Sequence, residues 1–555
     1  MNDPSPTPTS PAARDRAWLS EALAVGLGLW VAYLLLRTTD LLALGAFNDD
    51  GVYTAIGAAI ARGHGYRLLH LVGEPVAVKY PPGLPTLLAI PWTIGGSLSA
   101  IRTTVGILHP LLCGVAAAQL WWLGRRRLGL SRAVLAMLVI GPFLLAPAIE
   151  YYNLALSEPY FVAGWATALV LAARLLEVTP GPPRPGTAVA LGLTLSLTTL
   201  FRSAALVIIP AVVLALVIRG CRRREVILCT VAALLPLGAW SLFHAHLMAQ
   251  GPLPQIPDET SYWRWLPVRD PVHMVPYFIH VVVNNSIAYA SDLGRQLSDR
   301  PLLGGLGVVI GGAAIVFGAV RQLLWRPDLV LSVIASLAAI LLWPFSQDRL
   351  LLPWLPFAGL LAAAGLDEAP RRIRHAVWIV LGLAAVAVAV RQQRMRQAAE
   401  LAALTNAPLP PVNMSPRFVL LRNSRYILSL AGWVRTHTTS RDRLVVPFPG
   451  AIFLYTGRQT IPGAPADPAF GPSAFALPGR YLARRILLDS ATVIAVPSAA
   501  LLLATDIATI QAHCPDLLQW VGDGSPGSYP AIYRVAPDRT CLRLRMGEDA
   551  SPLDG

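Results

Sequence analysis

Residues 203–246 read SAALVIIPAVVLALVIRGCRRREVILCTVAALLPLGAWSLFHAH, which is two long apolar runs separated by a cluster of arginines. The runs cover 203–218 and 225–246, and a helix that crosses a bilayer needs about 20 mostly apolar residues. Arginines concentrate in the short cytoplasmic loops between membrane helices. The stretch therefore predicts two membrane helices joined by a cytoplasmic loop.

The same pattern recurs along most of the chain. Further apolar runs lie at 17–37, 101–123, 132–149, 159–176, 187–200, 302–323, 328–345, 350–366 and 374–391. Only 14% of the 555 residues are charged, whereas soluble domains carry about 25%, and the mean hydropathy is +0.54. We expect a polytopic α-helical membrane protein with about 11 spans. No small-residue cleavage site follows the first run, so we interpret it as a membrane helix rather than a secretion signal.

Arginine placement predicts the orientation of these helices. With the N-terminus in the cytoplasm, the loops at 124–132, 177–186, 219–224, 322–327 and 367–374 lie inside and hold most interhelical arginines. The loops at 150–158 and 346–349 then lie outside. Residues 83–96 are apolar but short, and a full crossing there would move Arg125–Arg127 outside. We therefore expect a half-helix at the outer interface, together with interfacial helices in the first outer loop.

The net charge of +14 does not indicate a nucleic-acid partner. A DNA-binding protein gathers its basic residues on one soluble face, whereas these arginines are divided among short loops.

The chain changes character near residue 392. We predict a transmembrane domain at 1–391 and an extracytoplasmic α/β domain at 392–555, where short strand-like pieces, 444–446 and 492–496, alternate with Gly/Pro turns. Cys514 and Cys541 lie in this second part. An oxidising compartment would let them form a disulfide, but spacing in the sequence leaves the pairing open.

The first outer loop, about 38–100, holds the side chains best suited to catalysis or substrate binding. Asp49 and Asp50 follow the first membrane helix, where a carboxylate could act as a general base on an acceptor hydroxyl. Either could instead cap the helix that begins near Gly51. Lys79 is the only lysine in the chain; it could bind a phosphate or extend its ammonium to the membrane interface.

Several motifs in order resemble a known superfamily. After the acidic pair come Arg62-Gly63-His64-Gly65-Tyr66, Tyr80-Pro81-Pro82-Gly83, Leu156-Ser157-Glu158-Pro159, Thr199-Leu200-Phe201-Arg202-Ser203 and Gln347-Asp348-Arg349-Leu350-Leu351-Leu352-Pro353. This series resembles the GT-C glycosyltransferases over residues 1–391. Within them it is similar to the glycosyltransferase family 39-like branch of protein O-mannosyltransferases and lipid A aminoarabinose transferases. The stretch 446–458 resembles the outer domain of such proteins. Phe201 and the missing proline after Arg202 depart from the pattern, as does Leu350.

The resemblance implies an integral membrane glycosyltransferase. A sugar would pass from a polyprenyl-phosphate donor to an acceptor hydroxyl on the outer face of the cytoplasmic membrane, with inversion. It implies Asp49 as general base, with Asp50 less favoured. Lys79, Arg349 and Arg202 are the implied ligands of the donor phosphate, and Tyr53, Glu158 and Tyr80 the implied substrate-binding residues. The acceptor could be a lipid, a glycan or a protein. We assign no cofactor, and metal dependence stays open.

Other interpretations of the same residues remain. Glu158 could cap the helix that starts at Pro159, Arg202 could lie at the membrane interface, and Arg349 could pair with Asp348. The chain could also be a transporter or flippase of a lipid-linked saccharide, or a non-catalytic member of a polysaccharide assembly machine. A transporter should carry broken helices near the membrane midplane, whereas these polar residues gather at helix ends. We expect 247–300 to form an aromatic outer loop.

Overall fold

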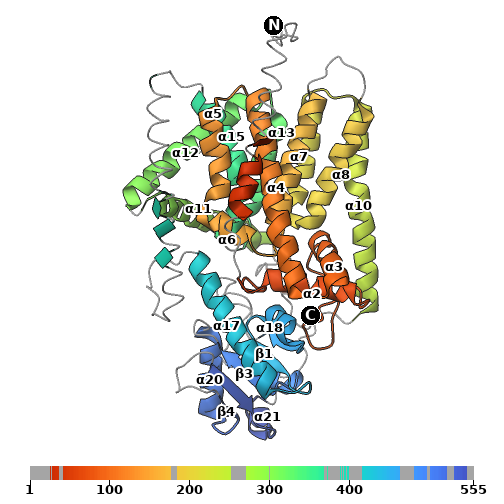
Figure 1. Ribbon diagram of the computed structural model, residues 1–555, viewed down its shortest axis with the longest axis vertical. Helices are drawn as coiled ribbons and strands as arrows, with labels where there is room; N and C mark the ends of the chain where they lie inside the picture. Colours follow the sequence, from red (N-terminus) through yellow and green to blue (C-terminus); the bar gives the residue numbers. More distant parts are fainter. Residues whose placement is uncertain are drawn as a thin grey trace.

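The computed structural model of the protein contains a helical bundle and an α/β unit at one end of that bundle (Figure 1). It describes residues 25–26, 28–36, 42–176, 184–251, 271–298, 300–344, 346–367 and 416–546, except 463–479, 497–500 and 522–530, with isolated positions between 372 and 398.

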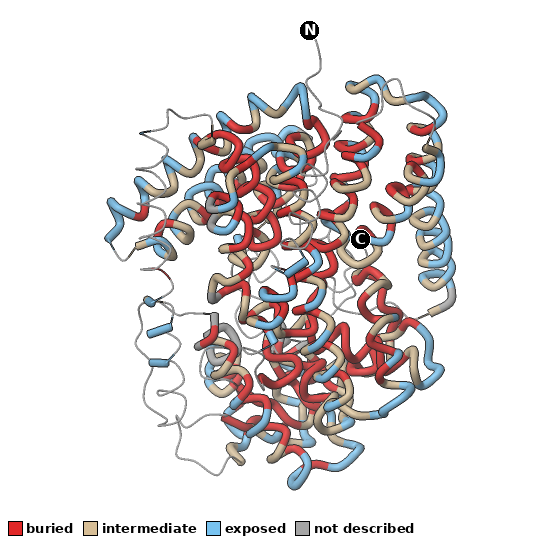
Figure 2. The backbone as a smooth tube through the Cα atoms, turned by 45° about the horizontal axis from the view of Figure 1, so that its top comes forward, coloured by how far each residue is buried: buried red, intermediate tan, exposed pale blue. Residues whose placement is uncertain are grey.

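Helices of the bundle differ in length and apolar character. Four are long and apolar enough to cross a membrane: α4 (Leu98–Arg126), α7 (Glu158–Leu176), α10 (Arg223–Gln250) and α12 (Pro301–Gln322). Shorter apolar helices are α3 (Gly83–Gly95), α8 (Pro185–Phe201), α9 (Ile208–Ile218) with its preceding 3₁₀ turn η3 (Ser203–Val207), α13 (Pro327–Leu341) and α15 (Leu355–Asp367). The outer helices leave large apolar side chains exposed, as in α10 and α12, while interior helices are buried (Figure 2). The bundle is therefore membrane-embedded; the number of spans remains a prediction.

Two of the predicted runs are interrupted in the structure. Residues 132–149 fold as α5 (Arg132–Leu135), a π-helical turn η1 (Ala136–Ile140), a 3₁₀ turn η2 (Gly141–Leu144) and the start of α6 (Ala146–Tyr152). Leu145 is extended, with ψ at 139°, and Pro142 and Pro147 lack the N–H groups that a continuous helix requires. Run 350–366 divides into α14 (Asp348–Leu351) and α15, with Pro353 between them. Run 374–391 lies largely outside the described residues.

One predicted loop is instead a helix. Residues 271–297 form α11 (Pro271–Leu297) within the region expected to be an aromatic loop. The Asn285 side chain on α11 donates to the Leu341 and Trp343 carbonyl oxygens, at 2.9 and 2.7 Å. These carbonyls lie at the C-terminal end of α13, where backbone acceptors lack helical partners. The loop prediction was wrong for these residues because this long-range packing stabilises a helix there.

The core of the bundle fixes α7, which carries Glu158 at its first position. Trp165 is fully buried, stacks on Phe357 of α15 with ring centroids 3.7 Å apart, and donates from Nε1 to Ser332 Oγ of α13 at 3.1 Å. Because its N–H group has a hydrogen-bond partner, the large indole ring can be buried here without leaving an unpaired donor. These contacts of Trp165 fix the N-terminal half of α7, and with it the position of Glu158.

The α/β unit contains a five-stranded sheet with strand order β2-β1-β3-β5-β4. Its strands are β1 (Leu444–Val446), β2 (Thr460–Pro462), β3 (Val493–Val496), β4 (Leu518–Trp520) and β5 (Ala531–Val535). Pairings β2-β1 and β1-β3 are parallel, and β3-β5 and β5-β4 antiparallel. The helices are α17 (Pro416–His437), α18 (Pro449–Thr456), α19 (Arg480–Leu488), α20 (Leu501–His513) and α21 (Thr540–Met546). The predicted boundary at 392 and the extracytoplasmic location remain predictions.

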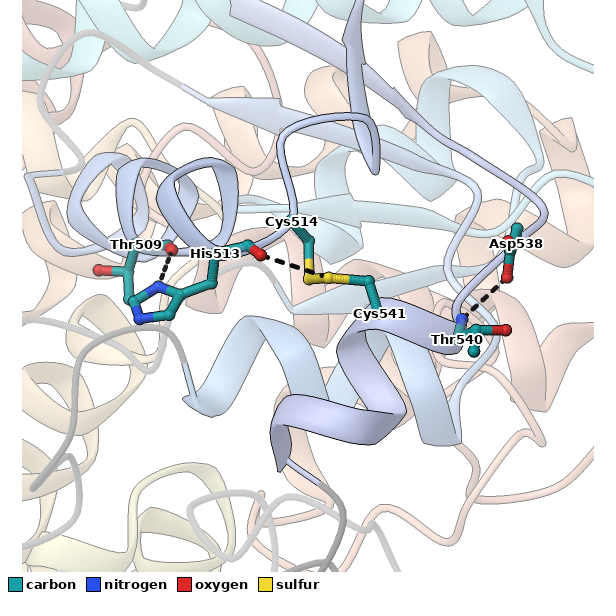
Figure 3. Close-up of a disulfide and its surroundings, with 6 residues drawn as sticks. All are labelled: Thr509, His513, Cys514, Asp538, Thr540 and Cys541. Carbon is teal, nitrogen blue, oxygen red and sulfur yellow. Dashed lines mark hydrogen bonds between the residues drawn. A yellow bond between two sulfur atoms is a disulfide. The ribbon is translucent and has the colours of Figure 1, made fainter.

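A disulfide joins Cys514, just after α20, to Cys541 in α21, with Cα atoms 5.9 Å apart (Figure 3). Spacing in the sequence left this pairing open; the fold brings the two thiols together.

Loops predicted to share a membrane side meet at the same end of the bundle. The Arg184 backbone N–H donates to Glu225 at 2.7 Å, and Arg219 donates to the Leu324 carbonyl at 2.9 Å. At the opposite end, where the α/β unit lies, Arg102 near the start of α4 donates to the Tyr455 hydroxyl at 2.7 Å (Figure 1). These loops therefore lie at the end of the bundle away from the α/β unit. The orientation in the membrane and the compartment that each end faces remain predictions.

Candidate functional site

The site begins at the first turn of α2 (Asp49–Ala61), which lies between the bundle and the α/β unit (Figure 1). Asn48 precedes the helix with φ at 79°, and no side-chain hydrogen bond caps the helix from this position. The Asp49 side chain keeps a quarter of its surface exposed, with a relative accessibility of 25%. Its carboxylate is therefore accessible while its backbone is held in a helix.

Asp49 belongs to an extended charge network. Arg349 Nη2 lies 2.5 Å from Asp49 Oδ2, and Arg349 Nη1 lies 3.7 Å from Glu158 Oε1. Arg202 Nη1 lies 2.9 Å from the same Glu158 oxygen. The structure thus brings together residues from α2, α7, α14 and the end of α8, far apart in the sequence. We call Asp49, Glu158, Arg202 and Arg349 the charge network.

Aromatic stacking fixes the Arg349 guanidinium. Its Cζ lies 4.2 Å from the Phe47 ring centroid, and its Nε donates to Gln347 Oε1 at 3.1 Å. Phe47 in turn packs edge-to-face against Tyr151, with centroids 5.5 Å apart. Arginine is suited to such a position because its planar group can stack and donate at the same time. The ion pairs of Arg349 are therefore with Asp49 and Glu158, rather than with the neighbouring Asp348 that the sequence offered as an alternative.

Glu158 is the most buried member of the network. Its side chain is only 1% exposed, and neither carboxylate oxygen has a hydrogen bond of good geometry among the described residues. The Arg202 ion pair is short but poorly aligned, and Arg202 donates instead to Ser157 Oγ at 3.2 Å. A buried carboxylate needs such cationic neighbours. Glu158 therefore depends on the guanidinium groups of Arg202 and Arg349 to compensate its charge.

Tyr53 lies one helical turn beyond Asp49. Burial raises the pKa of the Tyr53 hydroxyl, and the nearby charges of Asp49, Glu158, Arg202 and Arg349 partly offset one another there. The hydroxyl therefore stays protonated and can donate a hydrogen bond.

The remaining predicted residues adjoin Tyr53. Tyr80 packs edge-to-face on Tyr53 at 5.2 Å, and Lys79 Nζ lies 5.3 Å from the Tyr80 ring centroid. His244 Nε2 is 2.6 Å from the Val78 carbonyl oxygen, so it must be the donor and it holds this segment against α10. The two tyrosine rings therefore extend from Lys79 to the helix that carries Asp49.

Asp50 has an environment unlike that of Asp49. It is fully buried and accepts the backbone N–H groups of Gly45 at 2.7 Å and Phe47 at 3.1 Å. Burial raises the pKa of Asp50 to about 7, although these two hydrogen bonds act in the opposite direction. Consecutive residues on a helix point about 100° apart, which separates the two carboxylates. Asp50 stabilises the turn that carries Phe47.

Four residues that contact the network directly, or through Phe47, were given no role from the sequence. They are Phe47, Tyr151, Ser157 and Gln347. Phe47, Ser157 and Gln347 lie within two positions of a predicted site residue, and this proximity could have identified them. No sequence feature pointed to Tyr151. In the described part of the chain, no group of three or more His, Cys, Asp or Glu side chains is placed to hold a metal ion.

Solved structures of known proteins resemble this chain, whereas no family model and no curated protein sequence matches it. ArnT of Cupriavidus metallidurans superposes in the apo state with a TM-score of 0.53 and 15% identity, covering 95% of this chain and 99% of ArnT. The same protein bound to undecaprenyl phosphate gives a TM-score of 0.51 and 15% identity, over 94% of this chain and 98% of ArnT.

A second solved protein is similar in fold over part of its length. The Archaeoglobus fulgidus oligosaccharyltransferase, in complex with Zn and sulfate, matches with a TM-score of 0.50 and 14% identity, over 86% of this chain and 67% of that one. ArnT, a lipid A aminoarabinose transferase, and this enzyme are both GT-C glycosyltransferases. At these identities the likeness concerns the fold. The chain has the fold of the GT-C membrane glycosyltransferases, as the order of its motifs indicated.

Proposed function

We propose that the protein transfers a sugar from a polyprenyl-phosphate donor to an acceptor hydroxyl, with Asp49 as general base. The observation that carries the proposal is the contact of a partly exposed Asp49 with Arg349, beside the buried Glu158. An acceptor needs a carboxylate that it can reach, and a departing phosphate needs cations. The ArnT structure bound to undecaprenyl phosphate supports a donor of this class.

The Asp49–Arg349 ion pair suggests how the donor prepares the site. A donor phosphate near Arg349 would compete with Asp49 for the guanidinium N–H groups. Asp49 would then be free to accept the proton of the acceptor hydroxyl. The hydroxyl oxygen forms a bond to the anomeric carbon while the bond from that carbon to the phosphate oxygen breaks. The polyprenyl phosphate leaves with the electron pair, and attack from the opposite face inverts the anomeric centre.

Other residues take supporting roles in this mechanism. Arg349 and Lys79 stabilise the charge that develops on the leaving phosphate. Tyr53, with Tyr80 against its ring, offers a donor to hydroxyl groups of the sugar. Glu158, predicted to bind substrate, is enclosed and would instead keep Arg349 and Arg202 in place. Arg202 was predicted as a phosphate ligand; its 2.9 Å contact with Glu158 favours holding that carboxylate in place. Asp50 supports the loop instead of acting as a base.

Sugar transfer by purified full-length protein tests the proposal. Polyprenyl-phosphate sugars and a membrane-lipid extract are supplied to wild type, Asp49→Asn, Asp50→Asn and Asp516→Asn. Asp516 is an exposed residue of the α/β unit and gives a control of matched chemistry. We expect Asp49→Asn to lose transfer by about 100-fold or more while Asp516→Asn keeps it. Loss of folded protein is monitored by size exclusion.

Other outcomes would redirect the assignment. Equal transfer by wild type and Asp49→Asn would remove Asp49 from the chemistry. Tight donor binding with no transfer from any donor would favour a flippase or a non-catalytic assembly protein.

A further inference from the structure

The α/β unit contacts the turn that leads into Asp49. Ser424 Oγ of α17 accepts the Ala43 backbone N–H at 3.1 Å, and Asn423 Nδ2 donates to the Ala46 carbonyl at 2.9 Å. The Tyr455 hydroxyl of α18 accepts the Leu44 N–H at 3.0 Å. These residues are about 400 positions away in the sequence, with separations of 381, 377 and 411. Residues 43–48, which we call the Asp49 turn, are thus bonded to two helices of the α/β unit.

Glycines allow the two parts to approach at backbone distance. A Cβ built on Gly450 of α18 would lie 2.8 Å from the Gly51 carbonyl carbon of α2. A Cβ on Gly51 would lie 3.0 Å from the Gly45 Cα. Gly45 itself has φ at 90°, which residues with side chains rarely adopt. Such contacts leave little freedom because a packed interior cannot yield by much.

Further attachments lie on both sides of this contact. The Thr460 N–H and hydroxyl, in edge strand β2, both donate to the His70 carbonyl at 2.8 Å. Phe453 of α18 packs with Ala55 and Ala59 of α2. On α17, Arg417 forms a buried ion pair with Glu150 at 3.0 Å. The α/β unit therefore contacts the turn before α2, the helix itself and the segment that follows it.

We propose that the α/β unit positions the Asp49 carboxylate for transfer, with Tyr455 as a positioning residue. This inference rests on the proposed function, because it needs Asp49 to act in the reaction. Tyr455 holds Leu44 and, through Arg102 at 2.7 Å, the first turns of α4. Asp50 also holds this turn, by accepting the backbone N–H groups of Gly45 and Phe47. Phe47 lies under Arg349, so the turn sets both members of the Asp49–Arg349 pair.

The first test is Tyr455→Phe against Tyr426→Phe in the full-length protein. Tyr426 is also buried in the α/β unit, but its hydroxyl has no hydrogen-bond partner among the described residues. We expect Tyr455→Phe to lower kcat by about 10-fold or more, because a small displacement of a catalytic group reduces the rate strongly. The KM for the donor should change by less than about twofold. Tyr426→Phe should leave both constants unchanged. An unchanged kcat in Tyr455→Phe, or an effect on acceptor KM alone, would overturn the inference.

The second test does not depend on activity. Gly450→Ala is compared with Gly432→Ala, because a Cβ on Gly432 of α17 meets nothing within 4 Å. Hydrogen exchange of the Asp49 turn should accelerate at least 10-fold in Gly450→Ala and stay unchanged in Gly432→Ala. Acceleration spread evenly over the α/β unit would indicate plain destabilisation and contradict the positioning role. If wild type transfers no sugar, the proposed function fails, while this exchange experiment still decides whether the unit holds the turn.

Discussion

Arg349 lies 2.5 Å from Asp49, although 300 positions separate them in the sequence. The contact joins the start of α2 to the short helix α14 that follows the break after α13. It places a cation of fixed geometry against the one carboxylate of the Asp49–Asp50 pair that solvent can reach. The sequence motifs around Asp49 and Arg349 are each short and ambiguous. The ion pair shows that the two motifs belong to one site.

Replacing Arg349 by lysine should lower kcat/KM by about 100-fold, although the positive charge is kept. Lysine cannot pair with Asp49, reach Glu158 and stack on Phe47 at once, because its ammonium is a single point charge. Steady-state transfer kinetics measure the effect. Arg62→Lys is the matched control, since exposed Arg62 also lies over an aromatic ring, Trp92, at 5.7 Å. Equal rates in Arg349→Lys and wild type would exclude a geometric role for the guanidinium.

The Glu158–Arg202 pair should show strong coupling in a double-mutant cycle. Glu158→Gln alone leaves two guanidinium groups beside a neutral side chain, and breaking a buried pair costs about 3–5 kcal/mol. The double variant Glu158→Gln/Arg202→Gln should be less destabilised than the sum of the single variants. Thermal unfolding in detergent gives the values. Additive effects would mean that the 2.9 Å contact contributes nothing to stability.

Asp50 should make stability fall as pH rises towards neutrality. Burial raises its pKa from 3.8 to about 7 in the folded state, so the native protein binds the proton more tightly than the unfolded chain. Between these pH values the free energy of unfolding should decrease by at most about 1.4 kcal/mol per pH unit. Asp50→Asn removes this contribution, so its melting temperature should depend less on pH between about 5 and 7.

The comparison of wild type with Asp50→Asn isolates this residue. Asp348, whose pKa burial and Asp292 also raise to about 7, acts in the same direction in both proteins and cancels. Asp516→Asn serves as the control and should follow the wild-type curve. Parallel curves for wild type and Asp50→Asn would contradict the prediction.

The cysteines should divide into two classes. Cys514 and Cys541 are disulfide-bonded, while Cys113, Cys221 and Cys229 are free. Alkylation in denaturant should therefore add three labels without reductant and five with it, as read by intact mass. Cys514→Ser/Cys541→Ser should lower stability by about 3.6 kcal/mol, the chain-entropy value for a closed loop of this size. Five labels without reductant would show that the bond does not form.

The sequence by itself determined the membrane class, the order of the motifs and most members of the site. A bilayer demands apolar runs of a set length and arginine-rich inner loops, so both features are readable without tertiary information. Asp49, Glu158, Arg202 and Arg349 were all identified from local motifs, and the structure brings them into contact. Asp50 was predicted to be catalytic together with Asp49, because the sequence does not show which of two adjacent side chains on a helix is buried.

Only the tertiary structure decided what surrounds those residues. Burial separates Asp50 from Asp49, and packing turns Arg349 towards Asp49 instead of Asp348. The contacts of Ser424, Gly450 and Tyr455 with the Asp49 turn and the start of α2 join segments about 400 positions apart. No local pattern encodes such contacts, because they exist only where two independently formed surfaces fit at close packing.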